Sequence, residues 1–177
     1  MVMILPLLQV VILGALLLYL AKWRGSMRRR NIKSWDQLFC QLRTDWSAHA
    51  VCDQLLWKDN VSATHNDIWE KVNGPFGLWV MYQNARVLLE MADFAARHAS
   101  PDNPVDPLLL ESIRTDAMQI RLYVLMALMQ YGLHAISAGA RINAWRAAET
   151  YVLMAARLTR IMQEHAALEL PSFVAAM

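Results

Sequence analysis

Hydrophobic residues recur at the helical period along most of this chain, and no segment shows the period-two alternation of a half-buried strand. Glycine and proline gather at a few points, which divide the sequence beyond residue 33 into helical segments. The pattern predicts helices over about 34–57, 76–98, 107–136 and 141–167. Four helices of similar length with short or medium connections indicate an all-α domain over 34–170, most simply an up-and-down four-helix bundle.

Local signals mark the expected starts of two of these helices. Ser34, followed by Gln37 three residues later, has the spacing of an N-terminal capping box. Asp106 and Pro107 form a second pair, because aspartate caps a helix well and proline is tolerated in its first turn. Both positions are therefore expected to begin helices.

The end of the third helix and the last helix are less sharply marked. No charged residue occurs from Leu122 to Ala140, which is long enough for a second membrane span. The polar residues within this stretch and the arginines at both ends favour a central, largely buried bundle helix instead. Gly139 is expected in the turn before the last helix. Pro171 is expected to end that helix, so that 171–177 forms a frayed tail.

The N-terminal segment is the most apolar part of the chain. Residues 2–20 contain no charged side chain, whereas six cations fall between 22 and 33. Roughly 20 apolar residues cross a bilayer core, so we expect a transmembrane anchor over 1–22 and a basic juxtamembrane segment over 23–33. A cleaved signal peptide would carry its cations before the apolar run. The positive-inside rule then places the N-terminus outside and the bundle in the cytoplasm, at an inner or plasma membrane.

Charge is distributed unevenly between the two parts of the chain. Six of the seventeen Lys and Arg residues lie in 22–33, and the remaining eleven face all fifteen Asp and Glu residues, a net −4 for 34–177. The basic segment should therefore bind anionic lipid headgroups, not nucleic acid. Cys40 and Cys52 would lie about 18 Å apart on one predicted helix, too far for a disulfide.

Motifs that carry chemistry are absent from the sequence. Di-iron bundles need Glu-x-x-His on two helices, and no glutamate here has a histidine three residues later. Zinc, nucleophile-elbow and phosphate-loop motifs are also missing. His134 could ligate a haem together with another side chain, but a lone apolar-face histidine is more often a hydrogen-bonded core residue. We expect no catalytic residue, no metal and no cofactor, and thus no enzyme.

Other residues are candidates for contacts with membrane or protein partners. Gln9 could hydrogen-bond another membrane helix, and Gly14 with Ala15 would permit close helix approach. Tyr19 and Trp23 suit the headgroup region. Seven Trp and eleven Met residues favour adaptable protein contacts. The remaining candidates are the basic residues Arg24, Arg28, Arg29 and Arg30, and one stripe of the last helix formed by Tyr151, Met154, Leu158 and Ile161.

These patterns together predict a non-catalytic accessory subunit of a larger membrane complex. The anchor would pack against helices of that complex, and the bundle would cover part of its cytoplasmic face and stabilise assembly. An energy-transducing host, photosynthetic or respiratory, is expected only from how small single-span proteins are commonly used. The alternative is a membrane-tethered helical sensor or carrier that binds an apolar ligand or a tetrapyrrole between its helices.

Overall fold

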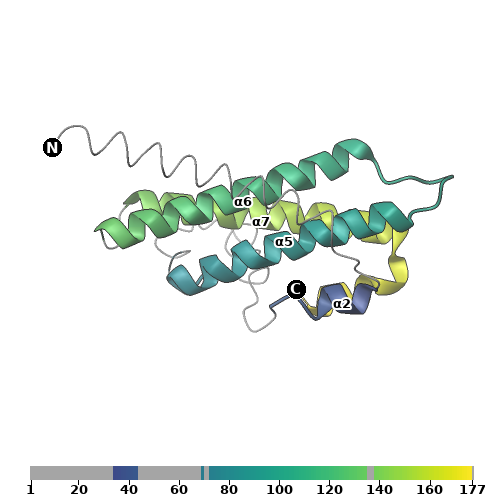
Figure 1. Cartoon of the computed structure of the whole chain (residues 1–177), viewed down its shortest axis with the longest axis horizontal. Coiled ribbons are helices and arrows are strands. Elements are labelled where there is room, and N and C mark those ends of the chain that lie inside the picture. The colour runs from purple at the N-terminus through teal and green to yellow at the C-terminus, as the bar shows by residue number, and fades with distance from the viewer. Residues whose placement is uncertain (1–33, 44–68, 70–71, 135–137, 177) are drawn as a thin grey trace, which may run out of the picture. The chain divides into compact units, whose positions relative to one another are not determined.

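The computed structural model describes residues 34–43, 69, 72–134 and 138–176, all within the compact unit Ser34–Met177. Every regular element in these residues is a helix (Figure 1), which confirms the predicted all-α class. In chain order the helices are α2 (Trp35–Phe39), α5 (Gly74–His98), α6 (Pro107–His134), α7 (Ala138–His165), the 3-10 helix η1 (Ala167–Glu169) and α8 (Leu170–Ala176).

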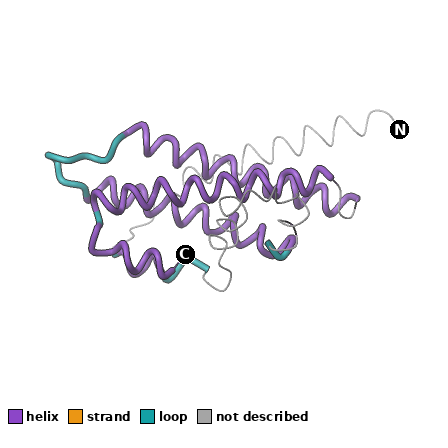
Figure 2. The backbone as a smooth tube through the Cα atoms, turned by 180° about the vertical axis from the view of Figure 1, so that it is seen from behind, coloured by secondary structure: helices purple, strands orange, loops and turns teal. Residues whose placement is uncertain are grey.

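Three long helices, α5, α6 and α7, pack side by side in an up-and-down order. Figure 2 shows the same arrangement from behind, with consecutive long helices running in opposite directions. The short helices α2 and α8 contact each other, and they also touch α5 and α7 respectively. The bundle-like packing predicted from the sequence is therefore confirmed for the described residues.

Small and aliphatic side chains form the core between the long helices. Helix α5 is buried around most of its circumference, with Leu78, Met81, Leu88 and Met91 at 0% exposure. Helix α7 faces α6 and α5 largely with alanines, including Ala140, Ala144, Ala147 and Ala148, all fully buried. Alanine leaves little side-chain volume between two helix backbones. Helices α6 and α7 can therefore pack closely along much of their length, within the 8–10 Å range of interhelical distances.

The expected helix starts are confirmed in detail. The Ser34 hydroxyl accepts a hydrogen bond from the Gln37 backbone N–H at 3.4 Å. At the start of α6, the Asp106 carboxylate accepts from the Leu108 N–H at 2.9 Å. Both side chains satisfy backbone donors that a helix N-terminus leaves without partners.

The prediction of one continuous helix over 34–57 is wrong, because α2 ends at Phe39. Residues 44–57, with Cys52, lie outside the described residues. Past Phe39 the backbone of Arg43 bonds to a side chain of another helix. The Asn84 amide oxygen accepts from the Arg43 N–H at 3.0 Å, and the Asn84 amide nitrogen donates to the Arg43 carbonyl at 3.2 Å. A long-range contact thus takes the backbone groups that a continuing helix would use. Cys40 follows α2 as an exposed free thiol.

The C-terminal boundary also differs from the prediction. Gly139 lies in the first turn of α7, not in a turn before it. Pro171 does not end the helical structure, because it falls in the first turn of α8, where its missing N–H costs nothing. The expected frayed tail is instead helical from residue 170 to 176, and Phe173, only 1% exposed, packs it against the bundle.

Two helical glycines provide a direct test of the packing where α6 meets α7. A Cβ at Gly132 would meet nothing within 4 Å, whereas one at Gly139 would lie 2.9 Å from the Gln130 amide oxygen. That oxygen accepts from Asn143 at 3.1 Å, so Gln130 cannot move without losing the bond. We expect Gly132→Ala to raise the free energy of unfolding by about 0.5–1 kcal/mol through helix propensity.

Gly139→Ala is expected to be at least about 1 kcal/mol less stable than Gly132→Ala, because the gain in propensity is offset by the displaced amide. Urea unfolding of the two full-length variants, followed by circular dichroism, measures the difference. Equal stability of the two variants would contradict this packing.

Candidate docking face of the helical bundle

Metal-binding and titratable side chains do not gather into a site in the described residues. No group of three or more His, Cys, Asp or Glu side chains could hold a metal ion there. His98 is exposed and lies within hydrogen-bonding distance of a backbone carbonyl one turn back. The His165 side chain is 4% exposed. The side chains of His49, His65 and His134, the last being the possible haem ligand, lie outside what the structure describes.

The outer face of α6 carries a continuous stripe of exposed apolar side chains. Its members follow one another at spacings of four, four and three residues, which places them on one side of a helix. The fully buried residues Ile113, Ile120 and Val124 lie about half a turn away, on the face packed against the bundle. The stripe, here called the α6 stripe, consists of Met118, Leu122, Met126 and Met129, with exposures of 53%, 48%, 38% and 56%.

No charged side chain interrupts the α6 stripe along its length. The only charged residue between Met118 and His134 is Arg121, which is 7% exposed and turned inward. Its guanidinium lies 5.2 Å from the Tyr82 ring centroid on α5, in cation–π geometry. From Met118 to Met129 the stripe runs about 16 Å at the rise of an α-helix. An exposed apolar stripe without interrupting charge is the strongest candidate for a docking face in the described residues.

This exposure corrects the prediction that 122–140 is a central, largely buried helix. Residues up to His134 belong to α6, which buries one face and exposes the opposite one, and Ala138 already begins α7. The second half of α6 carries apolar residues on more than one face, because no charged residue occurs from Leu122 to His134. Periodicity alone therefore does not say which of these faces the bundle uses.

The predicted docking stripe on the last helix also needs correction. The structure buries all four of its residues in the bundle core, at 0–1% exposure, where they contact the other helices: Tyr151, Met154, Leu158 and Ile161. Such side chains cannot reach a partner without opening the bundle. The exposed face of α7 instead carries Arg146, Glu149, Arg160 and Glu164.

The predicted membrane-contact residues lie outside the described residues: Gln9, Gly14, Tyr19, Trp23, Arg24, Arg28, Arg29 and Arg30. The same holds for the anchor over 1–22, which remains a prediction. Within the part of the chain that the structure describes, no helix combines the length and apolarity needed to cross a membrane.

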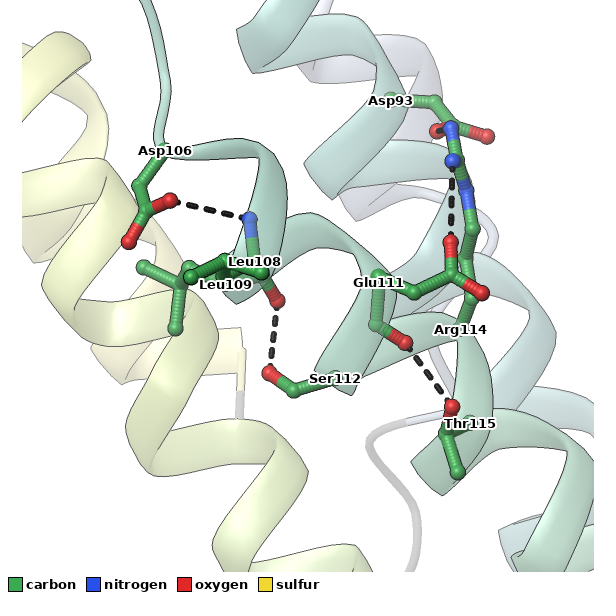
Figure 3. A network of polar contacts seen from close by, with 8 residues as sticks. All are labelled: Asp93, Asp106, Leu108, Leu109, Glu111, Ser112, Arg114 and Thr115. Atoms are coloured by element: carbon green, nitrogen blue, oxygen red, sulfur yellow. Dashed lines mark hydrogen bonds and ion pairs between the residues drawn. The ribbon is translucent and has the colours of Figure 1, made fainter.

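A polar network at the start of α6 fixes the helix on α5 (Figure 3). The Arg114 guanidinium donates to the Asp93 carboxylate on α5 at 3.0 Å and to Glu111 at 3.4 Å. The hydrogen bond with Asp93 is the main cause that raises the pKa of Arg114 above its usual value. Next to it, Ser112 and Thr115 donate to carbonyls of the preceding turn at 2.7 and 3.0 Å.

A second ion pair joins α6 to α7. Arg157 on α7 donates to the Asp116 carboxylate, which is 6% exposed. Burial raises the pKa of the Asp116 carboxyl above its usual value, and the Arg157 guanidinium opposes that rise without cancelling it. Because Arg114 holds α6 to α5 and Asp116 holds it to α7, the rotation of α6 is fixed. The α6 stripe therefore faces away from the core.

Comparisons of the chain with protein-family models, curated proteins and solved structures found no match. The bundle and its exposed apolar face are therefore the features from which a function can be inferred.

Proposed function

We propose that this protein is a non-catalytic subunit that docks its helical bundle onto a partner protein at a membrane. The α6 stripe is the observation that carries this proposal. Methionine and leucine without neighbouring charge form the kind of surface that receives an apolar helix of a partner, since flexible Met side chains adapt to irregular contacts. The host complex itself is not indicated by any described residue.

The sequence adds the reason for placing the partner at a membrane. The apolar run over 2–20 and the cations over 22–33 are the pattern of a single anchor with its basic side in the cytoplasm. A tether of this kind raises the effective concentration of the bundle beside its partner. A stripe of only four side chains, smaller than a standard interface, can then suffice for stable docking.

The proposal is tested by affinity purification of the full-length, C-terminally tagged chain from membranes in mild detergent. We expect wild-type protein to recover partner subunits in fixed stoichiometry, and the double variant Leu122→Glu/Met129→Glu to lose them. Glutamate keeps good helix propensity, and both side chains are exposed, so the fold should persist. Burying two carboxylates against an apolar partner surface is costly, so recovery should fall at least about tenfold.

The matched control is Leu153→Glu/Gln163→Glu, which adds the same charge to the exposed face of α7. Its recovery of partners should equal that of wild type. Equal recovery by both double variants would contradict docking through α6. Recovery of a lone wild-type monomer would contradict the subunit proposal altogether, and a bound chromophore in that monomer would favour the ligand-carrier alternative.

A further inference from the structure

Charge is strongly polarised along the described bundle. One half consists of the start of α5, the end of α6 and the start of α7, which lie at the same end of the bundle (Figure 1). In this half, residues 72–89, 117–134 and 138–148 contain no Asp or Glu but four arginines. The other half, residues 90–116 and 149–176, contains nine Asp and Glu against four arginines. The first half, in which the described ranges hold no Asp or Glu, is here called the cationic end; Asp67 and Glu70, which precede it in the chain, lie outside the described residues.

Exposed aromatic and apolar side chains gather at the cationic end. Phe76 and Trp79 are 50% and 43% exposed in the first turns of α5, and Tyr131 and Ile142 are 38% and 40% exposed on α6 and α7. The Trp79 indole stacks on the Tyr82 ring, with ring centroids 5.1 Å apart and ring planes 4° apart, and this contact restricts the motion of the indole. Rigid aromatic rings at a surface are typical of the lipid headgroup region.

Two of the four arginines are engaged within the bundle. Arg86 is ion-paired with Glu90 at 2.9 Å, and Arg121 is buried over Tyr82. The other two lie in the first three turns of α7. Arg146 is exposed, with its guanidinium 5.9 Å from the Tyr123 ring centroid, and Arg141 is half-buried, with its Nε atom fully buried. Arg146 therefore supplies the most accessible positive charge at the same end as Phe76 and Ile142.

We infer that the cationic end of the bundle binds the surface of an anionic phospholipid membrane. Phe76, Trp79 and Ile142 would enter the headgroup region, while Arg141 and Arg146 would contact lipid phosphates. Aromatic residues beside cations without acids are the composition of interfacial membrane contacts. The acidic half of the bundle is repelled by the same surface, so the contact also orients the bundle. The inference does not depend on a host complex or on the α6 stripe.

The test uses the full-length chain, with Cys40→Ser and Cys52→Ser, in vesicles of pure lipid. A single cysteine replaces either Phe76 or Leu108 and carries an environment-sensitive fluorophore. Both sites are exposed, by 50% and 80%, in first turns of helices at opposite ends of the bundle. In vesicles with anionic phosphatidylserine, the label at 76 should be quenched by nitroxide-bearing lipid, and the label at 108 should not. In pure phosphatidylcholine, neither should be quenched.

Charge reversal separates lipid binding from a structural effect of the label. Arg146→Glu should lower the ratio of quenched to unquenched label at 76 about tenfold, because it replaces an attraction to the anionic surface with a repulsion. Arg160→Glu makes the same change in charge on the exposed face of α7 in the acidic half, where Arg160 is paired with Glu164, and should leave the ratio unchanged. Absence of quenching at 76 in anionic vesicles, or equal quenching at 76 and 108, overturns the inference, and the cationic end would then belong to a protein contact. The partner purification above can succeed or fail independently of this result.

Discussion

Replacing Leu158 by alanine is expected to lower the free energy of unfolding by about 3–5 kcal/mol. Leu158 is 0% exposed on the core face of α7, between Met154 and Ile161 one turn away on either side. Truncation removes three buried carbons and leaves a cavity that the close-packed core fills only partly. The effect would show that this part of α7 serves the core, where the sequence had predicted a docking stripe.

The matched control is Leu153→Ala on the same helix, at a position 38% exposed. Its cost should stay below about 1 kcal/mol, because much of the removed surface already contacts water. Urea unfolding of the full-length variants in mild detergent, followed by circular dichroism at 222 nm, gives both values. Similar losses for the two leucines would contradict the assigned faces of α7.

Replacing Arg157 by methionine is expected to cause the second large loss in the free energy of unfolding. The Asp116 carboxylate is 6% exposed and would remain charged in the core without its partner. Breaking a fully buried pair costs about 3–5 kcal/mol, but the Arg157 side chain is 37% exposed, so water screens this pair. We therefore expect a loss of about 2–3 kcal/mol at neutral pH, and no more than about 0.5 kcal/mol for Arg160→Met, whose pair with Glu164 is exposed.

The loss caused by Arg157→Met should depend on pH with a defined sign. Burial already raises the pKa of Asp116 in the folded protein, and removing Arg157 removes the interaction that opposes this rise. The folded variant therefore binds a proton more tightly than the unfolded chain does. Its deficit should be full above the raised folded pKa of Asp116 and should shrink as the pH falls toward the unfolded value of 3.8. A deficit that grows on acidification would contradict a buried Asp116.

Local signals in the sequence identified those parts of the fold that local chemistry controls. Ser34 and Asp106 cap helices because their own side chains reach backbone N–H groups two or three residues ahead. The break of the first helix after Phe39 was not predictable in this way. It depends on Asn84, which lies 41 residues away in the chain and bonds the backbone of Arg43.

Local patterns in the sequence also could not predict which faces of α6 and α7 the bundle buries. Periodicity identified an apolar stripe on α7, but it could not show that the core of the bundle buries this stripe. In the second half of α6 apolar residues lie on several faces, so the outward face is fixed by contacts across the bundle, those of Arg114 with Asp93 and of Asp116 with Arg157. Asp93 and Arg157 lie on other helices, and no local pattern in the sequence predicts such long-range pairs.

Site-specific photo-cross-linking in intact cells tests the central claim most directly, since it needs no purification of the partner. A photoreactive amino acid is placed in the full-length chain at Leu122 in the α6 stripe or at Gln163 on the exposed face of α7. The docking proposal predicts a discrete cross-linked membrane-protein partner from position 122 and none from position 163. No cross-link from position 122, or the same products from both positions, would contradict it.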